Sequence, residues 1–286
     1  MVSIVRPLTT AIVAVAIVIA LVALLIGLIA VFQERVAFQP PGPPHPIPGD
    51  ARRVNYSASD GQQLFAYLVG TPAPNRRLLI AFHGNADMAG FQVDWAKEVF
   101  NRTGIAVLIT EYRGYSGLPG KPTYVGTQAD AEAAYTYTRE ILGVNADQIA
   151  YFGHSLGSAV ATELATRHQP YVLILESPFT SARDMAKGVI GRRPSGFMWN
   201  LVSRIHYDTV QKVKDLDVPV SVAHGAHDRL IPPTMGDEVF QASKKKGEWL
   251  LVPEASHNDV SMRGGEDYWS WITRSLTLQS KVVAEK

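Results

Sequence analysis

The sequence lacks cysteine altogether, and it lacks an excess of charge of either sign. The absence of cysteine excludes disulfides, a cysteine nucleophile and thiolate metal ligands, although it fixes no cellular compartment. In a chain of 286 residues, 27 lysines and arginines against 26 aspartates and glutamates leave a net charge of +1. No basic stripe interleaved with aromatic residues is present, so we expect no nucleic-acid partner. The remaining balance, 47% hydrophobic and 19% charged residues, is that of an ordinary globular protein.

The N-terminal segment has no charged residues over a long apolar run. Residues 8–32 contain no charged side chain and almost no polar one. About 20 apolar residues in a helix cross a hydrocarbon core of about 30 Å, so this run is long enough to span a bilayer. A cleaved signal peptide is the rival interpretation, but its apolar region usually spans only about 7–15 residues. We therefore expect an N-terminal tail over residues 1–7 and a single uncleaved transmembrane anchor over 8–32, with the lipid bilayer as a partner.

The segment after the anchor is rich in proline. Six prolines fall within residues 39–50, and proline favours an extended, semi-rigid chain, so residues 33–50 are predicted to form a linker. Arg6 precedes the span and Arg35, Arg52 and Arg53 follow it. A count of these charges favours a cytoplasmic domain, whereas long domains cross membranes largely regardless of charge. The charges leave the orientation open, and our working expectation is a catalytic domain outside the cytoplasm.

Residues 51–286 alternate between two kinds of pattern and are predicted to form one domain. Two strands come first, at 53–58 and 63–69. Apolar runs typical of buried strands follow, at 77–83, 105–110, 148–153, 171–176, 218–225 and 248–253. Helical patterns occupy 91–101, 127–142, 155–168, 234–246 and 267–278. This alternation predicts an α/β protein with a mostly parallel central sheet and helices on both faces. Residues 178–216 interrupt it, and we expect a short helical cap there, over the sheet edge where such folds bind ligands.

The pattern Gly-x-Ser-x-Gly at residues 153–157 centres on Ser155. A serine hydroxyl is a poor nucleophile unless a base takes its proton as it attacks. This pattern supplies a sharp strand-to-helix turn, the nucleophile elbow, that holds the serine for such an attack. Chance produces the bare pattern often, so its context carries the prediction. Here a predicted strand ends at Gly153 and a predicted helix begins at Ser155, as the elbow requires.

A serine nucleophile of this kind needs a histidine base and an acid, in the chain order serine, acid, histidine. His257 follows the last predicted strand and fits the base. Asp228 follows the strand before it and would orient the imidazole and stabilise its charged form. Glu176, one strand earlier, is the reserve candidate for the acid. The alternative to a catalytic role is that His257 is a polar loop residue and that Asp228 caps or stabilises a turn.

Acyl transfer also needs donors that stabilise the oxyanion. One is predicted to be the backbone N–H of Leu156, directly after the nucleophile. The other is predicted in the segment "HGNAD" at 83–87, where we assign the N–H of Asn85, with Ala86 as the neighbouring possibility. These groups need neither a metal nor an organic cofactor, and we expect none.

Six segments in a fixed order make the chain resemble an α/β-hydrolase of the Bem46-like group, which includes mammalian α/β-hydrolase-domain proteins with an N-terminal membrane anchor. They are "FHGNA" (82–86), "EYRGYSG" (111–117), "GHSLGSA" (153–159), "ESPFTS" (176–181), "HGAHDRLIP" (224–232) and "SHND" (256–259). The resemblance implies the α/β-hydrolase fold and triad roles for Ser155, Asp228 and His257. It also implies that Tyr112 and Arg113 shape the site without reacting.

One residue departs from the family pattern. Asp87 stands where the resemblance leads us to expect a smaller residue. A carboxylate near the entrance of the site could disfavour anionic acyl groups, and the alternative is that it faces water.

Together these patterns favour a membrane-anchored serine hydrolase that cleaves carboxylic esters or thioesters through an acyl-enzyme on Ser155. Small-molecule esters, lipids and acylated proteins are all candidate substrates. An acyltransferase with the same triad is an alternative, because one fold and one triad serve many acceptors. A catalytically silent membrane scaffold is a third hypothesis, and the intact order of serine, aspartate and histidine argues against it.

Overall fold

The computed structural model describes residues 5–41, 51–72, 76–191 and 195–278. Eight strands form one sheet in the order β1-β2-β4-β3-β5-β6-β7-β8. β1 pairs antiparallel with β2 and β2 antiparallel with β4, and the other neighbours pair parallel. The strands are β1 Arg52–Ser57, β2 Gln63–Val69, β3 Leu78–Phe82, β4 Ala106–Thr110, β5 Ile149–His154, β6 Leu173–Glu176, β7 Pro219–Gly225 and β8 Lys245–Val252.

The central strands are buried on both faces, which explains their continuous apolar runs. In β3 every residue is buried. Leu78, Ile80 and Phe82 point into one hydrophobic cluster, whereas Leu79 and Ala81 point into the other. Successive side chains of a strand point to opposite faces, so a strand covered on both faces has no polar position.

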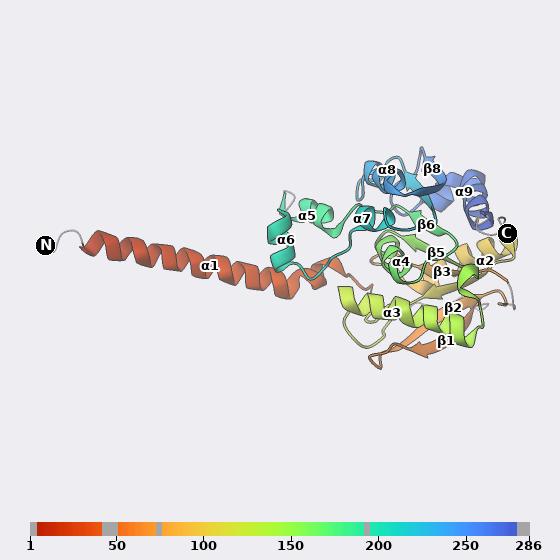
Figure 1. The fold of residues 1–286 in the computed structure, drawn as a ribbon, viewed down its shortest axis with the longest axis horizontal. Helices are drawn as coiled ribbons and strands as arrows, with labels where there is room; N and C mark the ends of the chain where they lie inside the picture. The colour runs from red at the N-terminus through yellow and green to blue at the C-terminus, as the bar shows by residue number, and fades with distance from the viewer. Residues whose placement is uncertain (1–4, 42–50, 73–75, 192–194, 279–286) are drawn as a thin grey trace, which may run out of the picture.

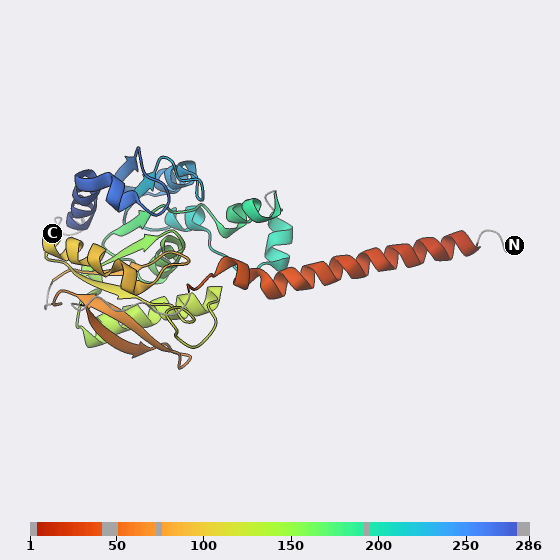
Figure 2. The same ribbon diagram turned by 180° about the vertical axis from the view of Figure 1, so that it is seen from behind.

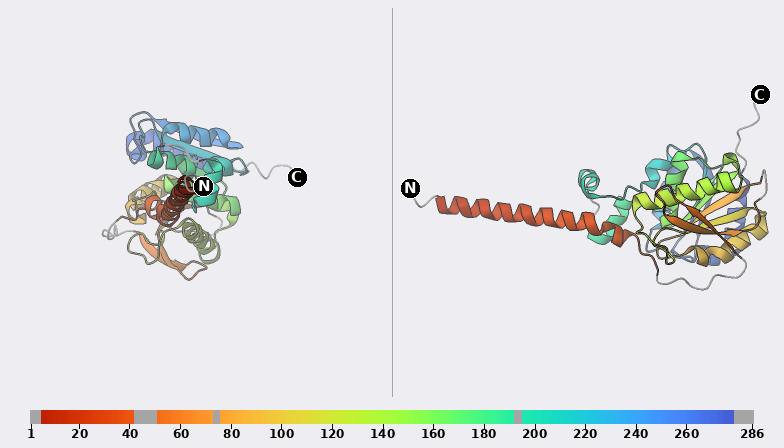
Figure 3. Two further views of the ribbon diagram at one scale, coloured as in Figure 1. Left: turned by 90° about the vertical axis from the view of Figure 1, so that its left-hand side faces the viewer. Right: turned by 90° about the horizontal axis from the view of Figure 1, so that it is seen from below.

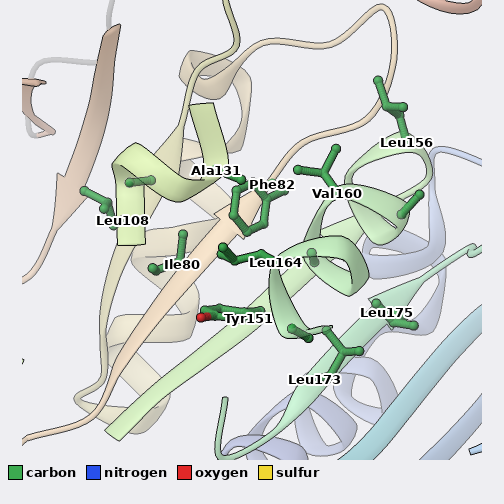
Figure 4. Packing of buried hydrophobic residues seen from close by; sticks show 14 of the residues in the cluster. Ile80, Phe82, Leu108, Ala131, Tyr151, Leu156, Val160, Leu164, Leu173 and Leu175 are labelled. Carbon is green, nitrogen blue, oxygen red and sulfur yellow. The ribbon is translucent and has the colours of Figure 1, made fainter. Parts of the chain in front are cut away.

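Helices cover both faces of this sheet, as Figures 1 and 2 show. In Figure 4, Val160 and Leu164 of α4 pack beside Phe82 and Tyr151 of the sheet. The face with α4 carries α3 Tyr124–Thr136, α4 Leu156–Arg167, α7 Thr209–Val213 and α8 Pro233–Ala242, and the opposite face carries α2 Val93–Thr103 and α9 Val260–Thr277. Short helical turns lie at Ala89–Gln92, Tyr137–Ile141 and Ala146–Gln148. The predicted α/β fold, with its mostly parallel sheet between two helical layers, is confirmed.

Several element boundaries differ from those predicted. The helix expected over 234–246 ends at Ala242, where the Ser243 hydroxyl donates to the carbonyl of Phe240. Lys245 already pairs with Pro219 in the sheet. β8 is an edge strand, and charged residues are common there because one side of it meets water. The last helix, α9, begins at Val260 and bends at Gly265, whose φ of 48° is non-helical.

The N-terminal helix α1, Val5–Ala37, projects away from the domain (Figure 1). Over Thr10–Ala37 its best 18-residue window has a mean hydropathy of 3.4, so by length and composition this helix could cross a membrane. The helix continues past Phe32, the predicted end of the anchor, and takes in the first residues of the predicted linker. The remainder of that linker, 42–50, lies outside the described residues, as do residues 1–4 of the predicted tail.

The predicted cap at 178–216 contains two further helices besides α7. They are α5 Ala182–Ile190 and α6 Gly196–Val202. An isolated bridge between Ser181 and Asp208 closes the base of the segment. In Figures 1 and 3, α6 lies beside the C-terminal part of α1, at the edge of the domain from which α1 projects. The cap thus joins the carboxyl edge of the sheet to the N-terminal helix.

Candidate active site

Ser155 lies on a tight turn between β5 and α4. Its φ of 52° and ψ of −115° are strained for a residue with a side chain. The turn is fixed from both sides: the N–H of Ser155 donates to the carbonyl of Glu176 (2.9 Å), and the N–H of Ser158 donates to the carbonyl of Ser155 (3.0 Å). This is the geometry expected of a nucleophile elbow.

Both glycines of the pattern are required by close approach. A Cβ on Gly153 would collide with the carbonyl of Gly157, and a Cβ on Gly157 would collide with the carbonyl of Phe82 in β3. These contacts are with backbone atoms, which cannot move aside as a flexible side chain can. Only glycine therefore allows β5, α4 and β3 to approach one another closely enough to form this turn.

His257 and Asp228 meet Ser155 in a hydrogen-bonded row. Nε2 of His257 lies 2.9 Å from Oγ of Ser155, and Nδ1 lies 2.6 Å from Oδ2 of Asp228. An ionised carboxylate only accepts hydrogen bonds, so Nδ1 carries a proton and donates to Asp228. Nε2 is then free to accept the hydroxyl proton of Ser155, and all three side chains are buried.

The loop that carries His257 is fixed against the end of β7. A Cβ on Gly225 would meet the carbonyls of Ala255 and Ser256 at 2.5 Å, so the two segments are in backbone contact. On the other side, the N–H of Ser256 donates to Oδ1 of Asp259 (2.6 Å). The imidazole is therefore positioned by its loop as well as by Asp228.

Asp228 is surrounded by donors. The N–H groups of Leu230 and Ile231 each donate to its Oδ1 at 2.9 Å, and Nε2 of His224 lies 3.3 Å from its Oδ2. Burial alone would raise the pKa of this carboxyl, but the hydrogen bonds from His224 and His257 outweigh it and hold the pKa well below its usual range. Asp228 is therefore ionised at neutral pH and able to stabilise an imidazolium.

Two backbone segments flank Ser155 where oxyanion donors were predicted. Leu156 opens α4, and the first N–H groups of a helix have no partner within it, so they are available to an anion. On the other side lies the loop after β3. A Cβ on Gly84 would lie 3.5 Å from Cβ of Ser155, so the residue before Asn85 is in contact with the nucleophile.

The side chain of Asn85 takes part in contacts that sequence reasoning did not foresee. Its Nδ2 donates to the carbonyl of Ala37 at the end of α1 (2.8 Å). Its Oδ1 accepts from the N–H of Gln39 (2.8 Å) and from the hydroxyl of Tyr115 (2.7 Å). The end of the N-terminal helix is thus bound directly to the loop where the oxyanion donor is predicted.

A second buried histidine–carboxylate pair supports the same loop. Nε2 of His83 lies 2.8 Å from Oε1 of Glu111, and its Nδ1 lies 2.8 Å from the carbonyl of Gly84. Burial alone would lower the pKa of His83, but the charge and hydrogen bond of Glu111 raise it above its ordinary value. The other carboxylate oxygen of Glu111 accepts from the N–H of Ala89 and from the hydroxyl of Ser116. Sequence reasoning missed Glu111, since nothing in its spacing indicates that it faces His83.

The other sequence-predicted residues have structural contacts. The hydroxyl of Tyr112 donates to the carbonyl of His83 (3.0 Å), and Arg113 pairs with Asp130 and Asp60. Asp87 accepts from the N–H of Met88 and from the side-chain amide of Gln92. The carboxylate of Asp87 is thus engaged within its own turn.

Glu176, the reserve acid, is paired elsewhere. Its Oε1 lies 3.8 Å from Nε2 of His154, whereas Nδ1 of His257 is paired with Asp228. Nε2 of His154 also lies 3.1 Å from the carbonyl of His257. The structure therefore brings Asp228, and not Glu176, to the ring nitrogen of His257.

The sheet order, the strand–turn–helix at Ser155 and the row of three side chains define an α/β-hydrolase fold. A solved structure, an esterase of Pyrococcus furiosus, superposes on it with a TM-score of 0.66 at 18% identity, over 84% of this chain and 98% of the other. The family model described as serine aminopeptidase, S33 matches residues 73–207.

Two curated relatives match over most of their length. An uncharacterized protein of Mycobacterium tuberculosis is 31% identical over 272 residues, covering 91% of this chain and 94% of that protein. The protein bem46 of Schizosaccharomyces pombe is 30% identical over 232 residues, covering 78% of this chain and 76% of its own. The chain therefore belongs to the Bem46-like family of α/β-hydrolases, as the sequence motifs indicated.

Proposed function

We propose that the protein is a membrane-anchored serine hydrolase that cleaves carboxylic esters or thioesters through an acyl-enzyme on Ser155. The observation that carries the proposal is the buried row of Ser155, His257 and Asp228, with separations of 2.9 and 2.6 Å, on a strained turn. A hydroxyl that donates to an imidazole oriented by a carboxylate is the arrangement that activates a serine nucleophile.

The chemistry proceeds in two balanced steps. Oγ of Ser155 attacks the acyl carbon while Nε2 of His257 takes the hydroxyl proton, and the N–H groups of Leu156 and Asn85 stabilise the oxyanion. The C–O or C–S bond breaks as His257 returns that proton to the leaving alcohol or thiol. Water then attacks the acyl-enzyme by the same route and releases the carboxylic acid and the free serine.

One of the solved neighbours and the apolar helix support this substrate class. The Pyrococcus furiosus protein described above is an esterase, whereas the matching family model is named for a serine aminopeptidase. The apolar helix α1 supports placement of the domain at a membrane, where acyl lipids and acylated proteins are available. Oxygen and sulfur esters are therefore proposed ahead of peptides.

The test compares wild type with Ser155→Ala in the full chain. Labelling by a fluorophosphonate probe and hydrolysis of short-chain nitrophenyl esters and thioesters should be present in wild type and lost in the variant. Aminoacyl nitroanilides serve as the peptidase comparison. Unchanged ester hydrolysis by a clean Ser155→Ala preparation would refute the nucleophile, and cleavage of the anilides alone would refute the substrate class.

A further inference from the structure

The cap helix α6 exposes three large apolar side chains. Phe197, Met198 and Leu201 are 77%, 41% and 65% exposed. At positions i, i+1 and i+4 of one helix, they lie on the same side of it. We call these three residues the α6 patch. Apolar groups gathered on the surface of a domain mark a contact with a partner or a membrane.

The α6 patch is held at a fixed place on α1. Nε2 of Gln33 donates to the carbonyl of Val202 (3.0 Å), and its Oε1 accepts from the N–H of Arg204 (2.8 Å) and from the hydroxyl of Ser203 (3.3 Å). Both the nitrogen and the oxygen of the Gln33 amide thus form hydrogen bonds at the C-terminal end of α6. Figures 1 and 2 show α6 crossing beside the C-terminal part of α1 instead of running along it.

The depth of α6 can be estimated from α1. Ile26, Ala30 and Gln33, at positions i, i+4 and i+7, are half-buried, whereas neighbours such as Phe32 are exposed. The uncharged run over residues 8–32 would be about 37 Å long as a helix, against a hydrocarbon core of about 30 Å. The part of α1 nearest α6 therefore falls at the boundary between hydrocarbon and headgroups.

Other groups at this end of α1 fit the same boundary. The N–H of Tyr124 donates to Oε1 of Glu34 (3.3 Å), and the next residue, Val125, is 72% exposed. Arg35 and Arg204 are also exposed there. Cationic side chains at a membrane surface are attracted to anionic headgroups. A helix that lies in a membrane interface has an apolar face with cationic side chains beside it. The α6 patch has this composition and is joined to a helix long enough to span a bilayer.

We propose that the α6 patch lies in the lipid interface, in the plane of the membrane, and docks the cap onto the bilayer that holds α1. This rests on the proposed membrane anchoring. The cap leaves the sheet just after Glu176, whose carbonyl accepts the N–H of Ser155. The cap therefore begins beside the nucleophile, and docking it onto the bilayer would hold Ser155 close to the membrane surface.

The test uses the absence of cysteine, which makes single-cysteine variants clean. Nitroxides are attached to Phe197→Cys, Leu201→Cys, Leu21→Cys and Met262→Cys in the full chain, reconstituted in phosphatidylcholine vesicles with some phosphatidylglycerol. Met262, in the first turn of α9, is an exposed apolar control outside the cap, and Leu21, within the apolar run of α1, marks insertion of that helix. Electron paramagnetic resonance then measures collisions with oxygen, which enters lipid, and with a nickel chelate, which stays in water.

We expect positions 197 and 201 to collide with oxygen at least about threefold more often, relative to the chelate, than position 262 does. If position 21 is protected but 197 and 201 behave like 262, this inference is overturned while the anchoring stands. If position 21 is itself open to the chelate, the anchoring fails. Spin–spin broadening between labels at 197 would place a second copy on the patch and would also overturn the inference.

The contacts of Asn85 carry a second inference independently of the α6 patch. Its side chain is bound by the carbonyl of Ala37, the N–H of Gln39 and the hydroxyl of Tyr115. The backbone N–H of the same residue is the proposed oxyanion donor. We infer that the end of α1 positions this donor, so that Asn85 connects the anchor to the rate of the reaction. This also rests on the proposed function.

The test is Asn85→Asp, which keeps the two acceptor contacts and removes the donor to Ala37. Tyr115→Phe removes one further contact of the same side chain. Tyr171→Phe is the matched control, because its buried hydroxyl donates to the carbonyl of Leu276 on the opposite side of the sheet. We expect kcat for nitrophenyl esters to fall about tenfold in the first two variants, with KM unchanged and the control at the wild-type rate.

Thermal unfolding separates positioning from general damage. A fall in kcat with an unchanged melting temperature supports the inference. Unchanged kcat in a folded Asn85→Asp variant, or a loss in all three variants that follows their stability, overturns it. A wild-type protein inactive toward every ester would instead count against the proposed function.

Discussion

Two buried histidine–carboxylate pairs flank Ser155, and they differ in what the second ring nitrogen faces. In the pair of His257 and Asp228, the second nitrogen faces the hydroxyl of Ser155, which can donate to it. In the pair of His83 and Glu111, it faces the carbonyl of Gly84, which can only accept. The Gly84 carbonyl requires a proton at Nδ1 of His83, and the raised pKa of His83 favours a second proton at Nε2, which faces Glu111.

This difference separates a base from a support. A general base needs a nitrogen with a free lone pair that faces the proton to be taken. His257 meets this requirement, whereas the ring nitrogens of His83 face the carboxylate of Glu111 and the carbonyl of Gly84, neither of which is a nucleophile with a proton to give. The two pairs have similar distances of 2.6 and 2.8 Å but different roles. The role of each histidine depends on the group that faces its second ring nitrogen.

The largest expected effect is that of Asp228→Asn on catalysis. An amide can donate to Nδ1 of His257 and so favour the wrong tautomer, and it no longer stabilises the imidazolium. We expect kcat for a nitrophenyl ester to fall by about 10⁴-fold. Steady-state kinetics on the folded variant measures this, and a loss of less than about tenfold would argue against Asp228 as the partner of His257.

We expect the main effect of Glu111→Gln to be a lower free energy of unfolding. It leaves His83 buried without its counter-charge, and removal of one partner of a buried ion pair costs about 3–5 kcal/mol. The matched control is Glu98→Gln, which breaks an exposed pair with Arg102 and should cost less than about 1 kcal/mol. Denaturant unfolding in micelles measures both. Equal effects of the two variants would show that the pair of His83 and Glu111 contributes no more than a surface pair.

The two pairs should respond to pH with opposite signs. Folding lowers the pKa of Asp228. Its ionised carboxylate therefore stabilises the folded protein at pH values above the unfolded pKa of about 3.9, and this stabilisation is lost as the pH falls. Folding raises the pKa of His83. Its pairing with Glu111 therefore stabilises the folded protein fully below about pH 6.5, and this stabilisation is lost as the pH rises through the folded pKa of His83.

Unfolding free energies of wild type, Asp228→Asn and Glu111→Gln across pH test these signs. The destabilisation by Asp228→Asn should shrink in acid, and that by Glu111→Gln should shrink in alkali. A penalty for Glu111→Gln that is the same at pH 6 and pH 9 would mean that His83 is neutral in the folded protein.

The sequence was sufficient to predict the sheet, the elbow and the pair of His257 and Asp228 because those signals are local or ordered along the chain. A glycine-flanked serine after an apolar strand needs no distant contact to be recognised. Glu111 and the side chain of Asn85 were missed because their partners, His83 and the end of α1, are distant in sequence. Their pairing depends on how β3, β4 and α1 pack together, which no spacing records.

The ends of α8 and α1 were also missed. The lysine run at the start of β8 has no apolar pattern, and its pairing with β7 makes it a strand. α1 continues past Phe32 because Gln33, Glu34 and Arg35 are good helix formers, so the end of the apolar run is not the end of the helix. At β8, by contrast, a tertiary contact overrides local composition.

The smallest expected effect belongs to Glu176→Gln. Glu176 was the reserve acid on chain order alone, and its Oε1 lies 3.8 Å from His154 instead of next to Nδ1 of His257. The substitution keeps the shape of the side chain and removes its charge, which acts on His257 only across the ring of His154, at a centroid distance of 5.1 Å. Because Asp228 already compensates the imidazolium directly, we expect kcat to change by no more than about threefold. Kinetics on Glu176→Gln and Asp228→Asn side by side measures the contrast, and a loss in Glu176→Gln as large as that in Asp228→Asn would transfer the role of the acid to Glu176.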